Sequence, residues 1–567
     1  MSSKEHDDRK IWKEEEFAEM AMGGCGRWQV TILLLLSVIK LPVAWTQLGI
    51  AFLAAPVTFH CSGSNLTCTT EAGDPCNSWR YDRSVFPETI ISEWDLVCSR
   101  SQLVNITQMV LMIGLLIGNF VFSIAADMFG RKLPLVVSGV LQMLTGCCAS
   151  FAPWFSAFLV LRFLQAVATG GAMTIGFVMC MEILSGKWRT TVTTLSHIPF
   201  NIGHEIMVPI AYFTRHWRLF QLATSLPSAL IITYLWLVPE SPRWLLAVGR
   251  HKEAVEVLRQ AAASNNIQIP EDVCFLKSEK ELMDMGEKKP TILDLLRTPN
   301  MRKKTLAMCF NWMARGLCFL DSVDIQLCFV RWTWEKKPTI LDLLRTPNMR
   351  KKTLAMCFNW MACGLCFLGL AHYVSTVNGN IFINVAIGGM FVIPGMIITL
   401  FTLDRVGRRA TLVGGNLLAS VSCFLIIVFH EAPGKSDLPR VVLVSLGILG
   451  MGISFPTAYL YSGELFPTVV RNSGIGSCSM CARIGSMVAP FAASLGTYNS
   501  ALSPLTFGTV PLVAAILTAL LLPETKGCQL PQTLEEGELF GSKSTDNVHK
   551  ENVGGFRNDA FQSDIQT

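Results

Sequence analysis

Charged residues are scarce in this chain, and the common catalytic motifs are missing. Asp, Glu, Lys and Arg make up 16% of its 567 residues, whereas soluble proteins carry roughly 25%. The sequence has no GxxxxGK[ST] loop, no HExxH and no GxSxG. These absences argue against an ATP-driven pump, a zinc protease and a serine hydrolase. We therefore expect no metal, no cofactor and no enzymatic activity.

Basic clusters are also missing. The net charge of +5 is small for this length, and the cations are scattered through short loops. Nucleic acid is therefore not an expected partner. Apolar sequence is abundant instead, at 51% of residues, which predicts a lipid bilayer as partner. We count twelve apolar windows long enough to span one, at residues 28–52, 103–126, 133–151, 155–181, 191–213, 219–238, 353–371, 381–401, 412–429, 441–461, 474–495 and 505–522.

The short loops between these windows predict the orientation of the chain. Lys and Arg concentrate in alternate loops, which places those loops in the cytoplasm. Both termini, residues 1–27 and 523–567, are then cytoplasmic, and the polar tail is predicted to be disordered. Residues 53–102 form a large extracellular loop with four cysteines, Cys61, Cys68, Cys76 and Cys98, and a glycosylation sequon at Asn65. Two disulfides are expected there, with three pairings open, in a plasma-membrane protein.

One repeat in the chain is nearly literal. Residues 287–320 reappear as residues 335–368 with a single difference, Arg315 against Cys363. Near-identity indicates a recent duplication of 48 residues rather than an old structural repeat. Because Arg315 interrupts the first copy and a charge at mid-membrane costs about 2.5–3.5 kcal/mol, we expect only the second copy to span. Residues 239–352 are then a cytoplasmic loop between membrane bundles at residues 28–238 and 353–522.

A second, diffuse repeat relates the two bundles. DMFGRK at residues 127–132 recurs as DRVGRR at 404–409, a Glu and an Arg lie seven residues apart in each half, and a Pro-Glu pair ends each half. The separations of 277, 282 and 284 residues become 229, 234 and 236 once the 48-residue duplication is removed. Such duplicated halves are typical of secondary transporters. The sequence thus predicts an all-α integral membrane protein with twelve transmembrane helices in two six-helix bundles.

These repeated residues are candidates for a gate. A carboxylate at a helix N-terminus and cations at a C-terminus are both favourable. We therefore expect Asp127 with Arg131, or Glu182 with Arg189, to form cytoplasmic ion pairs that hold the bundles together when the outer gate is open. The alternative is that these cations only fix the orientation of the chain in the membrane. The full set of motif residues is Asp127, Gly130, Arg131, Lys132, Arg162, Glu182, Arg189, Glu240, Arg243, Asp404, Gly407, Arg408, Arg409, Glu464 and Arg471.

The motifs resemble those of the major facilitator superfamily, whose cytoplasmic loops read GxxxD[RK]xGR[RK]. Arg162 with Gly170 and Gly171 is similar to the fourth-helix signature of that superfamily. CNSWRYD at 76–82, TIISEWDLVC at 89–98, PESPRWL at 239–245 and YSGELFPTVVRN at 461–472 resemble the organic cation/anion/carnitine transporters, including their arthropod members. The resemblance implies the major facilitator fold and alternating-access transport.

Ionisable residues inside spans are candidates for a substrate site because they are expensive there. Lys40 lies in the first span, and His197, Asn201 and Glu205 follow i, i+4, i+8 along the fifth. The alternatives are buried hydrogen bonds for the histidine and an ion pair of Glu205 with Lys40 or Arg483. Aromatic candidates for cation–π contacts are Trp360, Phe367, Tyr459 and Tyr461, although an aromatic in a span more often only packs.

Arg483 in the eleventh span discriminates best between substrates. It stands where the resembling cation transporters carry an aspartate and where carnitine and anion transporters carry arginine. A guanidinium binds carboxylate and repels a bare cation, so a zwitterion or an anion is favoured. We therefore expect a carrier of small organic ions, such as organic cations, carnitine-like zwitterions or amino-acid-derived metabolites, with Na⁺ or H⁺ as a coupling ion. The alternatives are an organic anion transporter, a sugar porter, or a receptor on a transporter scaffold.

Overall fold

A computed structural model describes residues 11–12, 14–62, 67–69, 76, 78–184, 188, 195, 197–268, 274–275, 345–428, 437–467, 470–528, 531 and 534–540. It divides the chain into two units. In the smaller, made of residues 1–17 and 270–338, strands β1 (Ile11–Trp12) and β4 (Cys274–Phe275) pair in parallel. Helix α1 (Glu14–Met22) begins there. The larger unit, residues 18–269 and 339–567, holds the apolar helices.

The first half of the larger unit contains six spans. Breaks at Ile39 and Gly49 divide the first span into three helices, and the sixth contains a 3₁₀ segment. The helices are α2 (Arg27–Val38), α3 (Lys40–Leu48), α4 (Ile50–Leu53), α6 (Gln102–Phe129), α7 (Lys132–Ser150), α8 (Phe155–Glu182), α10 (Ile198–Thr214), α11 (Trp217–Ser225), η2 (Leu226–Thr233) and α12 (Tyr234–Leu237). Two helices follow the bundle, α13 (Pro242–Ala247) and α14 (His251–Ser264).

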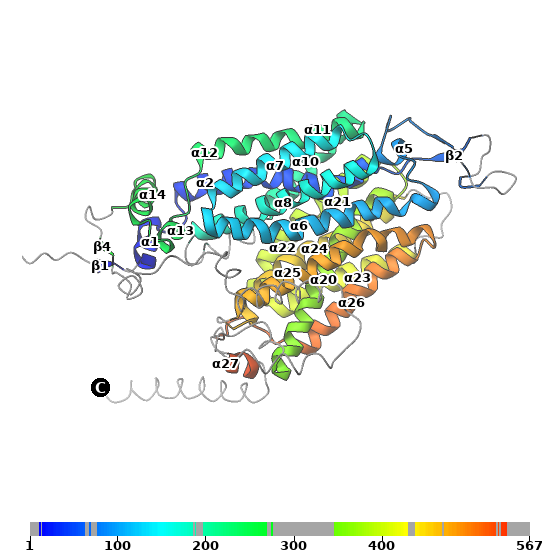
Figure 1. Cartoon of the computed structure of the whole chain (residues 1–567). Coiled ribbons are helices and arrows are strands. Elements are labelled where there is room, and N and C mark those ends of the chain that lie inside the picture. The colour runs from blue at the N-terminus through cyan, green and yellow to red at the C-terminus, as the bar shows by residue number, and fades with distance from the viewer. Residues whose placement is uncertain are drawn as a thin grey trace, which may run out of the picture. The chain divides into compact units, whose positions relative to one another are not determined.

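The second half repeats this layout. Its helices are α20 (Pro347–Thr376), α21 (Ile381–Met390), α22 (Val392–Arg405), α23 (Arg408–Val428), α24 (Leu438–Leu465), α25 (Arg471–Ser494), η6 (Leu495–Thr497) and α26 (Leu502–Leu521). Helices from the two halves lie lengthwise beside one another in this unit (Figure 1). Helix α25 packs against α6, and α10 packs against α21, so the halves meet along these pairs.

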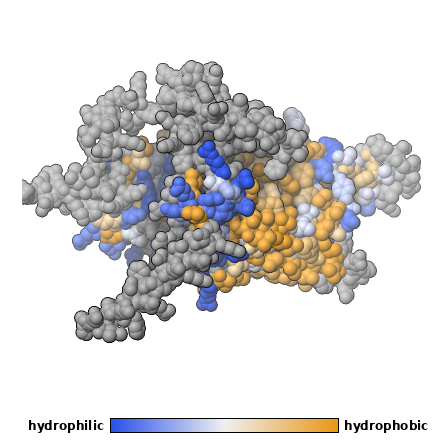
Figure 2. All heavy atoms as spheres, turned by 90° about the horizontal axis from the view of Figure 1, so that it is seen from below, coloured by the Kyte–Doolittle hydropathy of each residue, from blue (hydrophilic) through white to orange (hydrophobic). Residues whose placement is uncertain are grey.

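Eleven helices among the described residues are long and apolar enough to cross a membrane. The remaining expected span, residues 191–213, corresponds to α10, which has 17 described residues. Large apolar side chains point outward along the helices, for example Phe213 (81% exposed), Trp236 (76%) and Leu520 (75%). On the face seen in Figure 2 they form a broad hydrophobic surface with hydrophilic residues at its sides. Lipid, rather than water, suits such a surface.

Of the near-exact repeat, the structure describes only residues 345–368, which belong to the second copy. The second copy continues into α20, whose 30 residues include the expected span 353–371. Residues 287–320, the first copy, lie outside the described residues, and so does the sequon at Asn65. The expectation that only the second copy spans therefore stays a prediction.

The loop between the first and second spans is folded and tied to the first bundle. Disulfides join Cys61 to Cys76 and Cys68 to Cys98. The loop contains strands β2 (Phe59–Cys61) and β3 (Trp79–Tyr81), which pair antiparallel, and helices α5 (Ile90–Glu93) and η1 (Cys98–Arg100). Glu93 accepts hydrogen bonds from the Trp217 indole and the Arg218 guanidinium of α11. Below, the end of the helices that carries this loop is called the loop end, and the end that carries Arg131 and Arg408 is called the motif end.

Candidate functional site

The first motif loop builds a charge cluster at the motif end. Arg131 lies 2.7 Å from the Asp127 carboxylate and 2.9 Å from that of Glu182, at the end of α8. Burial tends to lower the pKa of Arg131, but the Glu182 and Asp127 carboxylates outweigh it and raise the pKa. Glu240 accepts the backbone N–H of Arg131 at 2.8 Å, so a carboxylate caps the N-terminus of α7.

The second motif loop builds the same cluster in the other bundle. Arg408 lies 2.9 Å from Glu464, at the end of α24. Glu524 accepts the backbone N–H groups of Arg408 at 2.8 Å and Arg409 at 3.1 Å, and it thereby caps α23. Each half thus has one arginine, one glutamate that pairs with it and one glutamate that caps the following helix. This repetition agrees with the corrected spacing of the motifs.

Both clusters depend on a glycine. Gly130 and Gly407 have backbone φ angles of +96° and +104°, which side chains with a Cβ rarely adopt. A Cβ at Gly130 would also collide with the Glu240 carboxylate, and one at Gly407 would lie 2.7 Å from an oxygen of Glu524. The glycine therefore allows the chain to turn and the capping carboxylate to approach.

The ion pairs of the two clusters lie within single bundles. Each described pair joins elements of the same bundle, because each motif loop lies within short reach of the adjacent helix end. The expectation that such pairs hold the two bundles together concerns the conformation that is open on the outside, and it stays a prediction. Glu182 pairs with Arg131, and Arg189 lies outside the described residues.

The remaining motif residues have separate partners. Arg243 reaches Glu19 at 3.6 Å, and Arg471 donates to the Phe466 carbonyl at 3.2 Å. Lys132 donates its backbone N–H to Glu240 at 3.3 Å. Asp404 is exposed and, unlike Asp127, forms no ion pair with another described residue.

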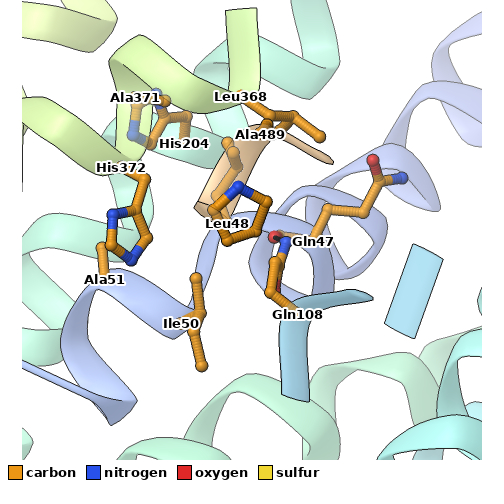
Figure 3. A pocket seen from close by; sticks show the side chains of 11 residues that line it. Gln47, Leu48, Ile50, Ala51, Gln108, His204, Leu368, Ala371, His372 and Ala489 are labelled. Carbon is orange, nitrogen blue, oxygen red and sulfur yellow. Dashed lines mark hydrogen bonds between the residues drawn. The ribbon is translucent and has the colours of Figure 1, made fainter. Parts of the chain in front are cut away.

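A cavity lies between the bundles, nearer the loop end than the clusters. It is small, with a cavity volume of about 20 Å³, which is room for about one water molecule. Four polar side chains line it. Gln47, Gln108 and His204 come from the first half, and His372 comes from α20 in the second half. The imidazoles lie toward one side of the cavity and the amides toward the other (Figure 3). The rest of the lining is apolar, from Leu48, Ile50, Ala51, Leu368, Ala371, Ala489 and Pro490.

An aromatic cluster lies between this cavity and the motif end. Trp360 of α20 packs against Tyr459 of α24, with ring centroids 5.1 Å apart, and against Phe455 at 5.7 Å. His197 packs against Phe455 at 5.5 Å, and Phe177 of α8 packs against Tyr459 at 5.9 Å. Three of the predicted site residues, His197, Trp360 and Tyr459, therefore meet where the two bundles contact.

Arg483 lies beside this cluster. Its Nη2 is 3.7 Å from the Met173 sulfur, which also accepts from Gln47 Nε2 at 3.7 Å. It also interacts electrostatically with Tyr459. Within the described part of the chain, no carboxylate forms an ion pair with Arg483, so its guanidinium keeps its charge available for a ligand.

The predicted residues of α10 face the second bundle. Asn201 donates to the Met396 sulfur at 3.7 Å, and its Oδ1 is buried without a described partner. Glu205 lies against Gly389 of α21, and its buried Oε1 likewise accepts no hydrogen bond from a described residue. Lys40 begins α3 and interacts electrostatically with His197. The alternative of an ion pair between Glu205 and Arg483 is not realised among these residues.

Comparison with known proteins identifies the family. The family described as "Sugar (and other) transporter" matches residues 49–323, and "Major Facilitator Superfamily" matches residues 353–556. The Organic cation transporter protein of Drosophila melanogaster is 33% identical over 82% of this chain and 77% of its own length. Solute carrier family 22 member 3 of Mus musculus is 35% identical over 82% of this chain and 74% of its own. The chain belongs to the organic cation transporter family, solute carrier family 22.

Solved structures agree with this family at the level of the fold. The xylose transporter XylE from E. coli, in an inward-open conformation, aligns with a TM-score of 0.58 over 91% of this chain and 100% of its own, at 15% identity. A peptide transporter, POT, aligns with a TM-score of 0.55 over 90% of this chain and 97% of its own, at 12% identity. This solute carrier family 22 member is therefore a multi-pass secondary transporter with the major facilitator fold, and not an enzyme.

Some predicted residues of this transporter lie away from the cavity. Tyr461 is fully buried in the second bundle, where its hydroxyl donates to the Pro523 carbonyl. Arg162 is buried in the first bundle and donates to the Thr46 carbonyl at 3.4 Å. Phe367 is half-buried against the core that both bundles share. Tyr461 thus has a structural contact rather than access to a substrate, and Arg162, predicted only as a motif residue, joins α8 to α3.

Rings close the transporter at the loop end. Phe382, at the start of α21, packs against Phe52, Phe86 and Tyr212 of the first half, with centroid distances of 5.7, 5.5 and 5.4 Å. Phe52, Phe86 and Phe382 are almost fully buried. We call these four residues the loop-end cluster. The two bundles are therefore held together at the loop end by ring contacts.

The C-terminal tail also differs from the expectation of disorder. Helix α27 (Leu534–Leu539) docks on the motif end of α20. Glu538 accepts the backbone N–H groups of Asn348 at 2.8 Å and Met349 at 2.7 Å, and the Lys352 ammonium donates to the Gly537 carbonyl at 3.0 Å. The expectation is wrong for residues 534–540 because this segment caps a helix N-terminus. Residues 541–567 lie outside the described residues.

Docking of α27 is expected to weaken in acid. Burial raises the pKa of the Glu538 carboxyl, but hydrogen bonds, including those from the Asn348 and Met349 N–H groups, and the Lys352 charge outweigh it and lower the pKa. Stabilisation by a depressed carboxyl is complete above the unfolded pKa of about 4.3 and is lost as pH falls through the folded pKa. Hydrogen exchange of residues 534–540, corrected for intrinsic rates, should therefore accelerate below about pH 4. Glu538→Gln should show this fast exchange already at pH 7, and unchanged protection in that variant would contradict the assignment.

Sequence reasoning missed several residues that the structure brings together. Gln47, Gln108 and His372 line the cavity, and Phe382 closes the loop end. His372 lies one residue beyond the expected span 353–371, and α20 continues to Thr376, so a longer span would have included this histidine. Gln47 and Gln108 are uncharged, and Phe382 is one of 33 phenylalanines, so there was no reason to select these residues from the sequence before their neighbours were known.

Proposed function

We propose that this protein transports small organic ions across the plasma membrane by alternating access, and that a carboxylate on the substrate is recognised by Arg483. The observation that carries the proposal is the placement of Arg483. It lies on a membrane helix next to Tyr459 and Met173, where the bundles meet, without an ion-pair partner among the described residues. An intramembrane cation is expensive, and a substrate carboxylate would compensate it.

The substrate class follows from both signs of charge at this contact between bundles. Arg483 suits a carboxylate, and Glu205, whose Oε1 has no described partner, suits a cationic group. Carnitine-like zwitterions and amino-acid-derived metabolites carry both groups, and organic anions carry the first. A bare organic cation, the substrate in the name of the Drosophila relative, would meet repulsion from Arg483.

The proposed orientation places the motif end and both termini in the cytoplasm and the disulfide loop outside. Positive loops at the motif end and disulfides at the loop end support it. The loop-end cluster would then close the outer entrance, and transport would require its rings to separate. A coupled Na⁺ or H⁺, together with the membrane potential, is the proposed driving force.

Uptake by cells that express the full chain tests the substrate assignment. Carnitine, γ-aminobutyrate, tetraethylammonium and a dicarboxylate would be compared with and without sodium. Arg483→Asp should lower uptake of the carboxylate-bearing substrates at least about tenfold and favour tetraethylammonium, because loss of one charge-assisted interaction costs roughly 1.5–3 kcal/mol. Arg100→Asp, the same charge reversal at an exposed loop residue, serves as the control.

The outcomes are distinct. If Arg483→Asp reaches the cell surface with unchanged selectivity, the role of Arg483 is refuted. If no organic ion accumulates but a ligand binds saturably, the chain is a receptor on a transporter scaffold instead.

A further inference from the structure

The cavity between the bundles contains buried polar atoms that have no partner. Gln108 is 4% exposed, and its Oε1 accepts no hydrogen bond from a described residue. On the facing helix α20, the buried Nδ1 of His372 is also unpartnered among those residues. Both side chains line the cavity (Figure 3). Buried polar atoms normally have partners, because leaving one unsatisfied costs about 1–3 kcal/mol.

The Gln108 amide is fixed in its orientation. Its Nε2 donates to the backbone carbonyl of Gln47, at 3.0 Å in α3. The amide nitrogen is thereby committed to the first bundle, and the oxygen is left as an acceptor at the cavity wall. Rotation of the amide would break this bond and place two N–H groups in the cavity instead. Gln108 is therefore an acceptor rather than a donor for a bound molecule.

A third acceptor lies close by on α10. Glu205 and its neighbour His204 both approach Gly389, and His204 lines the same cavity. The buried Oε1 of Glu205 has no hydrogen-bond partner within the described chain. Glu205 is not one of the lining residues, so the cavity wall itself presents Gln108 Oε1 from α6 and the His372 ring from α20. A ligand group that satisfies them must carry several N–H donors.

The wall of this cavity has two imidazole rings but no larger aromatic side chain. Its eleven lining residues, all of them described, include no Trp, Tyr or Phe. The neighbouring rings of Trp360, Tyr459 and Phe455 pack against one another on the motif-end side. A quaternary ammonium group has no N–H and is recognised mainly by aromatic faces. The cavity wall therefore offers hydrogen-bond acceptors, whereas a quaternary ammonium group would need the faces of large aromatic side chains.

We propose that the cavity lined by Gln108 and His372 receives the N–H-bearing end of the substrate, a primary ammonium or a guanidinium, and that it selects against N-trimethylated analogues. This proposal rests on the proposed transport of small organic ions and narrows it to amines with N–H groups. It therefore favours amino-acid-derived metabolites over carnitine-like zwitterions, whose nitrogen is trimethylated. A trimethylated substrate would leave Gln108 Oε1 and the His372 ring unsatisfied. Sites built to bond an N–H discriminate strongly against analogues that lack it.

Matched pairs of compounds test the proposal on the full-length protein in cells. γ-Aminobutyrate and its N-trimethyl derivative differ only in the methyl groups, as do n-butylammonium and n-butyltrimethylammonium. We expect the N–H-bearing member of at least one pair to be taken up with a kcat/KM at least about tenfold higher, the equivalent of one satisfied acceptor. This comparison uses the unmodified protein, so it does not depend on any variant folding.

Variants then assign the preference to residues. Gln108→Leu and His372→Leu should lower uptake of the N–H-bearing member and bring the ratio within each pair toward one. Leu368→Met changes an apolar lining residue without altering acceptors and should keep the ratio. Cell-surface biotinylation would be used to normalise uptake to the amount of protein.

Each outcome decides something. Equal uptake within the pairs, or preference for the trimethylated member, would overturn this inference and leave the proposed transport of organic ions standing. A tenfold preference that survives both variants would remove Gln108 and His372 from the recognition. Failure to take up any organic ion would refute the proposed function itself, and this inference with it.

Discussion

Arg131→Ala is expected to destabilise the first bundle by about 3–5 kcal/mol, the usual cost of removing one partner from a buried ion pair. The Arg131 side chain is 11% exposed and that of its partner Glu182 is 17% exposed. Without the guanidinium, the Glu182 carboxylate stays in a poorly solvated position and loses its ion-pair partner among the described residues. The measurement is the midpoint of thermal unfolding of the detergent-purified protein, together with its abundance at the cell surface.

Asp127→Asn is the matched control for this loss. The Asp127 carboxylate also pairs with Arg131, at 2.7 Å, but it is 73% exposed. Exposed pairs contribute about 1 kcal/mol or less, so this substitution should leave the unfolding midpoint almost unchanged. Equal losses in Arg131→Ala and Asp127→Asn would show that burial of the Glu182 pair is not what matters.

The second bundle offers a graded comparison. Arg408→Ala removes the same kind of pair, but Glu464 keeps a hydrogen bond from the Thr525 hydroxyl at 2.6 Å. The carboxylate is therefore less isolated than Glu182 would be, and a smaller loss is expected. Arg408→Ala combined with Thr525→Val should approach the cost of Arg131→Ala.

Hydropathy and the repeated motifs were sufficient to predict the fold because lipid imposes local rules. A span needs about 20 apolar residues whatever it packs against, so its position can be read from sequence. The motif glycines and arginines could likewise be found by their repetition. Gly130 and Gly407 have positive φ, and Arg131 and Arg408 each hold a glutamate at the end of a nearby helix.

Partners across long sequence separations were less predictable. Arg131 had Asp127 nearby in sequence and Glu182 far away, and packing decides that the second is the buried one. Tyr461 and Tyr459 are two residues apart on one helix, yet only Tyr459 faces the contact between bundles. A helix turns by 100° per residue, so the choice of face depends on neighbours that a single sequence does not reveal.

Phe382→Ala is expected to open the loop end. Three ring contacts cross from Phe382 to the first half of the chain, and each such contact contributes about 0.5–1.5 kcal/mol beyond its area burial. Losing all three contacts would cost roughly 1.5–4.5 kcal/mol. This cost destabilises only the conformation in which the bundles touch at the loop end. The equilibrium should therefore shift about tenfold to a thousandfold toward the conformation open at that end.

Accessibility of the cavity measures this shift. A cysteine introduced at Ala51, a residue of the cavity wall, should react faster with a membrane-impermeant thiol reagent added outside when Phe382→Ala is also present. Phe507→Ala is the matched control, because Phe507 is fully buried but its ring contact, with Tyr373 at 6.4 Å, stays within the second bundle. That control should lower stability without changing the labelling rate. If both variants accelerate labelling equally, general loosening of the protein explains the effect, and the loop-end cluster is not a gate.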